Sequence, residues 1–182
     1  MKREIMLGAG LAGLLAVAVG CGRSGAPETP AVVAAETPAA LAAVFHAVPA
    51  PESLTSIPAL RTAVQPGDVV VIEAKVMGTE APFVDGRALV VVGDEGTLTS
   101  CNLLRPGDTC ETPWDVCCED AEAIGAGTAT IQVVDGEGRV LKTDLRGVNG
   151  LVELSRVRVA GTVAPESTAD ALIINAEAIE VL

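Results

Sequence analysis

Aromatic residues are nearly absent from this sequence. Its 182 residues include two Phe, one Trp and no Tyr, although hydrophobic residues make up 49% of the chain. A core must therefore be built from Val, Ile, Leu and Ala. Because β-branched side chains pack well on a pleated sheet, we expect a mainly β protein.

Basic residues and histidine are also scarce. Twelve Lys and Arg face 24 Asp and Glu, which gives a net charge of −12. Binding to nucleic acid or to anionic lipid by charge requires a Lys/Arg patch, so we expect no nucleic-acid partner. The one histidine, His46, lies in an Ala- and Pro-rich segment, which disfavours Ser-His-Asp and Cys-His mechanisms. We expect a non-catalytic protein that needs no cofactor.

The N-terminus has the pattern of an export signal. Lys2 and Arg3 precede an uncharged apolar run over Ile5 to Val19. This run has the length of a signal-peptide core and is short for a transmembrane helix, which needs about 20 residues. It ends at Ala18-Val19-Gly20-Cys21, and small residues before a cysteine resemble the lipobox of bacterial lipoproteins.

The resemblance implies that residues 1–20 are a lipoprotein signal peptide and that Cys21 carries fatty acids such as palmitate. The membrane would then be a partner through the lipid on Cys21. Gly22 stands where many lipoproteins with an inner-membrane retention signal have Asp, so the outer membrane is favoured. The protein would lie in the cell envelope, facing the periplasm or the surface. Secretion without a lipid and an uncleaved anchor remain alternatives.

Residues 21–51 are rich in Ala, Pro, Thr and Glu, which is typical of a flexible tether. Residues 52–182 form the folded domain. Alternating apolar residues and turns rich in Gly and Asp predict strands at residues 69–76, 128–134, 155–163 and 171–182. Residues 83–92 are predicted to form a further strand or a hairpin, with Asp85-Gly86 as a tight-turn or bulge signal.

This pattern predicts an all-β protein with a small five-stranded barrel, and the stretches GDVVVIEAKVMG, VRVAGTV and ALIINAEAIEV resemble OB-fold proteins of the bacterial envelope. A β-sandwich is the main rival. OB-folds often stack nucleic-acid bases on aromatic residues in a basic groove. That role does not transfer to an acidic domain whose only aromatic residues are Phe83 and Trp114. Both are candidates for a ligand contact or for packing.

Four cysteines lie in a loop over residues 101–118, namely Cys101, Cys110, Cys117 and Cys118. An even number of cysteines in an exported protein favours disulfides. We expect Cys101–Cys117 with Cys110–Cys118, or Cys101–Cys118 with Cys110–Cys117. The stretch CETPWDVCC resembles one in uncharacterised bacterial lipoproteins, which implies a family but no activity.

A metal site is the alternative interpretation of this loop. It lacks the C-x2–4-C spacing usual for structural zinc, and adjacent cysteine side chains are expected to diverge. Redox-active thiols are a further alternative. The loop region also carries six acids without a calcium-loop register, which favours a solvated acidic loop: Asp108, Glu111, Asp115, Glu119, Asp120 and Glu122.

The sequence therefore predicts a membrane-anchored extracytoplasmic lipoprotein with a binding or envelope-structural role and an unknown ligand. An envelope protein is a candidate partner. The alternative is a metal-binding or redox lipoprotein that uses the four-cysteine loop.

Overall fold

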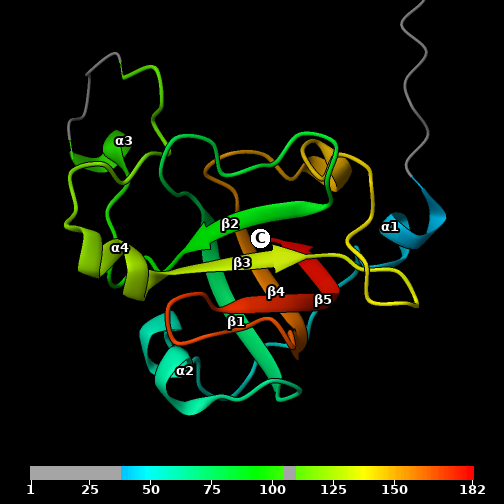
Figure 1. The fold of residues 1–182 in the computed structure, drawn as a ribbon. Coiled ribbons are helices and arrows are strands. Elements are labelled where there is room, and N and C mark those ends of the chain that lie inside the picture. The colour runs from blue at the N-terminus through cyan, green and yellow to red at the C-terminus, as the bar shows by residue number, and fades with distance from the viewer. Residues whose placement is uncertain (1–37, 105–109) are drawn as a thin grey trace, which may run out of the picture. The chain divides into compact units, whose positions relative to one another are not determined.

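Five strands close into a barrel in the order β1-β2-β3-β5-β4 (Figure 1). The computed structural model describes residues 38–104 and 110–182. The strands are β1 (Val69–Val76), β2 (Leu89–Gly93), β3 (Thr128–Gln132), β4 (Arg156–Val163) and β5 (Ile173–Val181). Neighbours are antiparallel except for β3 and β5, which are parallel. The prediction of an all-β, five-stranded, OB-like barrel is confirmed.

Buried and more exposed residues alternate along the strands, so that one face of each strand lies in the barrel core. In β4, Val157, Val159 and Val163 are buried while Arg156 is exposed and Arg158 is half-buried. Because successive side chains point to opposite faces, the β-branched residues meet inside the barrel and the charged ones remain outside. The core is almost entirely aliphatic, as the composition requires.

The register of β4 against β5 shifts between Ala160 and Gly161, which marks a bulge. A Cβ at Gly161 would overlap the backbone oxygen of Asn175 on β5. Only glycine allows the two strands to approach this closely, and such irregularities help a small sheet to bend into a barrel.

Helix α2 (Ile57–Ala63) comes directly before β1, and its N-cap is Ser56, whose side chain accepts a hydrogen bond from the backbone N–H of Ala59. Pro58 lies in the first turn of this helix, where its missing N–H costs nothing. Ile57 and Leu60 bury the apolar face of the helix.

The chain packs on the barrel earlier than the predicted domain boundary at residue 52. Helix α1 (Ala39–Ala43) carries Leu41, which has no exposed surface and belongs to the main core. Downstream of it, the Ile179 N–H on β5 donates to the Val44 carbonyl at 2.7 Å. Residues 39–48 are therefore part of the folded domain, although the sequence predicts a tether there.

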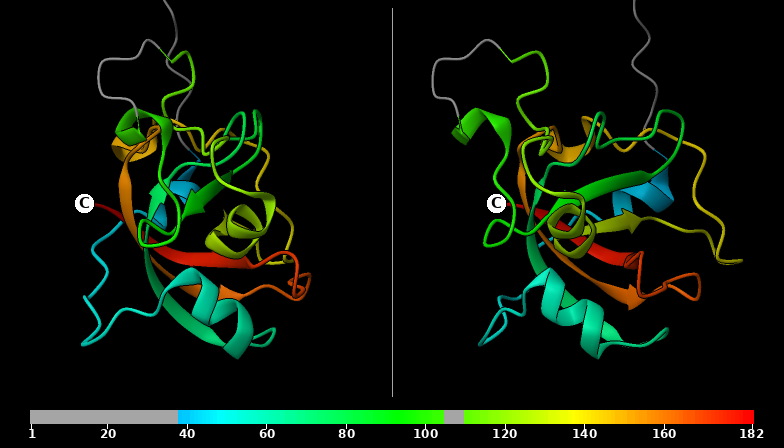
Figure 2. Two further views of the ribbon diagram at one scale, coloured as in Figure 1. Left: turned by 90° about the vertical axis from the view of Figure 1, so that its left-hand side faces the viewer. Right: turned by 60° about the vertical axis from the view of Figure 1, so that its left-hand side comes forward.

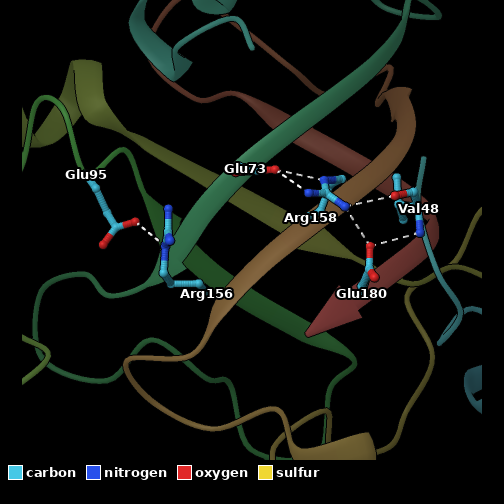
Figure 3. A network of polar contacts seen from close by, with 6 residues as sticks. All are labelled: Val48, Glu73, Glu95, Arg156, Arg158 and Glu180. Carbon is cyan, nitrogen blue, oxygen red and sulfur yellow. Dashed lines mark hydrogen bonds and ion pairs between the residues drawn. The ribbon is translucent and has the colours of Figure 1, made fainter. Parts of the chain in front are cut away.

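Arg158 joins this N-terminal segment to three strands (Figure 3). Its guanidinium donates to Glu73 on β1, to Glu180 on β5 and to the backbone oxygen of Val48, and the Val48 N–H donates back to Glu180. The hydrogen bonds to Glu73, together with the negative charges of Glu73 and Glu180, raise the pKa of Arg158. The network lies on the outer face of the barrel and is largely shielded from water, with the Arg158 side chain 16% exposed.

Between β2 and β3 runs an insertion, residues 94–127, that contains α3 (Cys101–Leu104) and α4 (Ala121–Gly127). Leu98 and Val116 of the insertion pack with Met77, the residue after β1, in a small second core. Between β3 and β4 the chain makes one short 3-10 helix, η1 (Val148–Gly150). Helices α2 and α3 lie on opposite sides of the strands in each view (Figure 2). The predicted signal peptide and Cys21 fall outside the described residues, and within them no helix is long and apolar enough to cross a membrane.

Candidate functional site

The insertion gathers three thiols at one point on its surface. The Sγ atoms of Cys101, Cys117 and Cys118 all lie within 4.8 Å of one another, and the Cys101–Cys117 separation is 3.6 Å. Cys101 is buried, whereas Cys117 and Cys118 are exposed. Cys110 is exposed and lies outside this group, with its Sγ 3.7 Å from Thr112 Oγ1.

These distances bear on both interpretations of the cysteine loop. A disulfide has an S–S length of about 2.05 Å, and the four described cysteines are free thiols. The predicted pairings are not formed in this structure and stay predictions for the oxidised protein. Thiolates about 2.3 Å from a tetrahedral ion are spaced about 3.8 Å apart, close to the 3.6 Å between Cys101 and Cys117.

A tight turn explains how two adjacent cysteines meet the same partner. The Glu119 N–H donates to the Val116 carbonyl at 3.0 Å, so Cys117 and Cys118 occupy the two central positions of a turn. The Sγ atoms of both reach Cys101. The expectation that these neighbouring side chains diverge is therefore wrong for this turn.

Helix α3 presents Cys101 to that turn because its start is bonded to the returning chain. The Cys101 N–H donates to the Asp115 carbonyl at 2.8 Å, and the Asn102 N–H donates to the Pro113 carbonyl at 3.0 Å. In addition, Glu119 accepts the Thr99 N–H at 2.9 Å. These hydrogen bonds, and not a covalent link, therefore hold Cys101 close to Cys117, which lies 16 positions later in the chain.

A buried lysine anchors α3 to the barrel. Lys75 lies on β1 and is 7% exposed, and its Nζ donates to Ser100 Oγ at 2.9 Å. The Ser100 hydroxyl in turn donates to Asn102 Oδ1 at 2.7 Å. Burial lowers the pKa of Lys75, and nearby Glu95 opposes this effect. Although a Ser–Lys pair can act as nucleophile and base, Ser100 has no exposed surface, so substrate cannot reach its hydroxyl in this structure.

Trp114 fixes the other side of the loop. Its indole N–H donates to the Glu80 carbonyl at 2.6 Å, and its backbone oxygen accepts the Gly78 N–H at 3.3 Å. Trp114 therefore ties the insertion to the connection between β1 and β2. Phe83, the other aromatic candidate, is 5% exposed in the main core, and the Arg146 guanidinium lies 5.2 Å from its ring centroid. Phe83 packs, and it presents no ligand surface.

Burial and its thiol neighbours make Cys101 less acidic than a free cysteine. Burial, followed by the hydrogen bond with Cys117 and the charges of the other cysteines, raises the pKa of Cys101 to about 12. A neutral thiol is therefore favoured at Cys101 in the metal-free chain. A bound cation would reverse this preference because metal ligation requires the thiolate.

The acids around the loop do not assemble a second site among the described residues. Glu119 accepts the Thr99 N–H, and Asp120 caps α4 by accepting the Ala123 N–H. Asp115 Oδ1 is buried without a hydrogen-bond partner. Asp108 lies outside the described residues. His46 is exposed beside α1 and has no part in the thiol group.

The barrel also carries a shallow hollow of about 260 Å³ on its outer face over β2 and β3. Its lining includes Arg61, Asp170 and three threonines, of which Arg61 donates to the Ala169 carbonyl. This lining has one basic and one acidic residue and no aromatic ring. It therefore lacks the stacking platform and positive field that single-stranded nucleic acid requires.

Fold and site together define an OB-like barrel with a thiol cluster on an insertion between β2 and β3. Comparisons with protein-family models, with curated proteins and with solved structures found no match.

Proposed function

We propose that the protein is a membrane-anchored extracytoplasmic lipoprotein whose OB-like domain binds a thiophilic metal ion at Cys101, Cys117 and Cys118. The observation that carries the proposal is the convergence of three Sγ atoms within 4.8 Å of one another, with those of Cys101 and Cys117 3.6 Å apart. Soft thiolate ligands select zinc, copper(I) or iron–sulfur clusters.

A single ion fits this spacing better than a cluster does. In a [4Fe–4S] cluster each cysteine ligates a different iron, and in a [2Fe–2S] cluster no iron takes more than two cysteines, so three ligating sulfurs are spread around a group wider than one ion. The three sulfurs here are close enough to share one ion. Zinc(II) is the best match because it accepts thiolates at about 2.3 Å in tetrahedral geometry without redox chemistry.

The charge around the loop also suits a cation. The chain carries a net charge of −12, and Glu111, Asp120 and Glu122 are exposed near the cysteines in sequence. A negative surface raises the local concentration of cations. Moreover, the positive charge of a metal ion would offset the burial and the neighbouring thiols that raise the pKa of Cys101.

The loop keeps its shape through contacts that need no metal. Lys75 and Trp114 tie it to the barrel, and Met77, Leu98 and Val116 give it a small core. The thiols are therefore preorganised, which suits a binding site and does not require the ion as a fold-forming staple. This separates the proposed role from that of a zinc finger, which is unfolded without metal.

The test is metal analysis of the full chain carrying Cys21→Ser, purified under reducing conditions and offered zinc. We expect one zinc per chain, protection of Cys101, Cys117 and Cys118 from alkylation, and loss of zinc in Cys117→Ser. Two disulfides by intact mass, with no bound metal after reduction and reloading, would support the disulfide-stapled alternative and refute the metal site.

The anchor is tested separately on the unmodified chain. We expect the protein in the membrane fraction, a diacylglyceryl modification on Cys21 by mass spectrometry, and release from the membrane in Cys21→Ser. Retention of unprocessed residues 1–20 on a membrane-bound chain would point to an uncleaved anchor instead.

A further inference from the structure

The thiol group has only three members among the described residues. No fourth Cys, His, Asp or Glu of residues 38–104 and 110–182 brings a donor atom within 4.8 Å of all three sulfurs. Cys110 is the obvious fourth ligand by sequence, yet its Sγ lies against Thr112 Oγ1 and its side chain is exposed. The tetrahedral position left by the three thiols is therefore not filled by Cys110.

The exposure of the three cysteines indicates which way the fourth coordination position faces. Cys101 is 9% exposed and lies on the protein side of the group, whereas Cys117 and Cys118 lie at an exposed turn on the solvent side. An ion held by all three sulfurs would have protein on the Cys101 side and solvent on the other. Its fourth coordination direction would then open toward solvent.

We infer that the metal centre is a three-thiolate site whose fourth position takes an exogenous ligand, a water molecule that a thiol can replace. This inference rests on the metal-binding function proposed above. Structural zinc sites are closed by four protein ligands, whereas sites that act on or exchange with external ligands keep one position open. Thiol is the expected class of ligand because three soft ligands already make the ion thiophilic.

Such a site can exchange its ion. A donor or acceptor thiol that enters the open position makes a fourth bond before any protein ligand leaves, so the ion need not be released into water. Cys110 is not required to hold the ion, because its Sγ lies against Thr112 Oγ1 and outside the group of three sulfurs.

X-ray absorption of the zinc-loaded chain, with Cys21→Ser, distinguishes these arrangements. We expect three sulfur neighbours and one light atom per zinc, and four sulfur neighbours after β-mercaptoethanol is added. Cys110→Ser should give the same counts and a zinc dissociation constant within about twofold of the parent chain. Cys118→Ser is the matched control and should weaken zinc binding by more than the roughly 10- to 100-fold typical of outer-shell changes.

Two outcomes would overturn the inference while leaving the metal site intact. The first is four sulfur neighbours in the parent chain that fall to three in Cys110→Ser, since Cys110 would then close the site. The second is a sulfur count of three that added thiol does not change. The absence of bound zinc in every variant would refute the metal-binding function itself.

Discussion

Replacing Leu41 with alanine tests where the folded domain begins. Leu41 has no exposed surface and belongs to the main core, although it precedes the domain boundary at residue 52 that composition indicates. Leu→Ala at a buried site costs about 2–5 kcal/mol through lost transfer energy and the cavity left behind. For a domain of this size we expect a loss of about 3 kcal/mol and a fall in Tm of roughly 6–12 °C.

The assay is urea unfolding under reducing conditions, followed by far-ultraviolet circular dichroism and by the fluorescence of Trp114. The first probe reports on the barrel and the second on the insertion, so coincident transitions also test two-state behaviour. Leu54→Ala is the control because Leu54 is 51% exposed, and we expect it to change stability by less than about 0.5 kcal/mol. A Leu41→Ala variant as stable as this control would show that residues 39–48 do not belong to the domain.

Three further substitutions probe the barrel and the insertion. Gly161→Ala forces a Cβ against the backbone of β5, so we expect the free energy of unfolding to fall by about 3 kcal/mol in the same urea assay. An unchanged free energy of unfolding would refute the close approach of the two strands. Trp114→Phe removes the hydrogen bond to Glu80 and should cost about 1 kcal/mol, with faster amide exchange in the insertion; unchanged exchange would contradict its anchoring role. Lys75→Met removes a buried ammonium whose pKa is lowered by burial. Because the unfolded chain binds the Lys75 proton more tightly than the folded chain, the stability of the parent protein should rise relative to that of Lys75→Met as pH increases toward about 10.4. Parallel curves of stability against pH for the two proteins would refute the effect of burial.

The strands could be predicted from the local pattern of apolar and polar residues. VVVIEAKV predicts a strand at Val69–Val76, and β1 has these same bounds. Ser155–Val163 was predicted for β4, which begins one residue later. These predictions succeed because the two-residue alternation of a strand is written in neighbouring residues. For residues 83–92 the sequence predicts a strand or a hairpin. The hairpin forms, since Phe83 pairs with Val90 across the turn at Asp85-Gly86 and β2 begins at Leu89.

The thiol group was harder to predict, because it depends on contacts between distant residues. The sequence singled out the four cysteines but favoured pairing them, since spacing alone does not show which sulfurs meet. The turn at Val116–Glu119 and the bonds from α3 to Pro113 and Asp115 place Cys117 and Cys118 beside Cys101 and leave Cys110 out. No local periodicity encodes that exclusion.

By itself, then, the sequence determined an aliphatic β-barrel and the loop that carries its cysteines, because composition and strand alternation are local properties. The tertiary structure decided which three thiols converge, that Lys75 is buried against Ser100 and that Leu41 joins the core. Each of these depends on the insertion or the N-terminal segment folding back on strands far away in the chain, and the free energy of such contacts comes from burial and hydrogen bonds between residues that are distant in sequence.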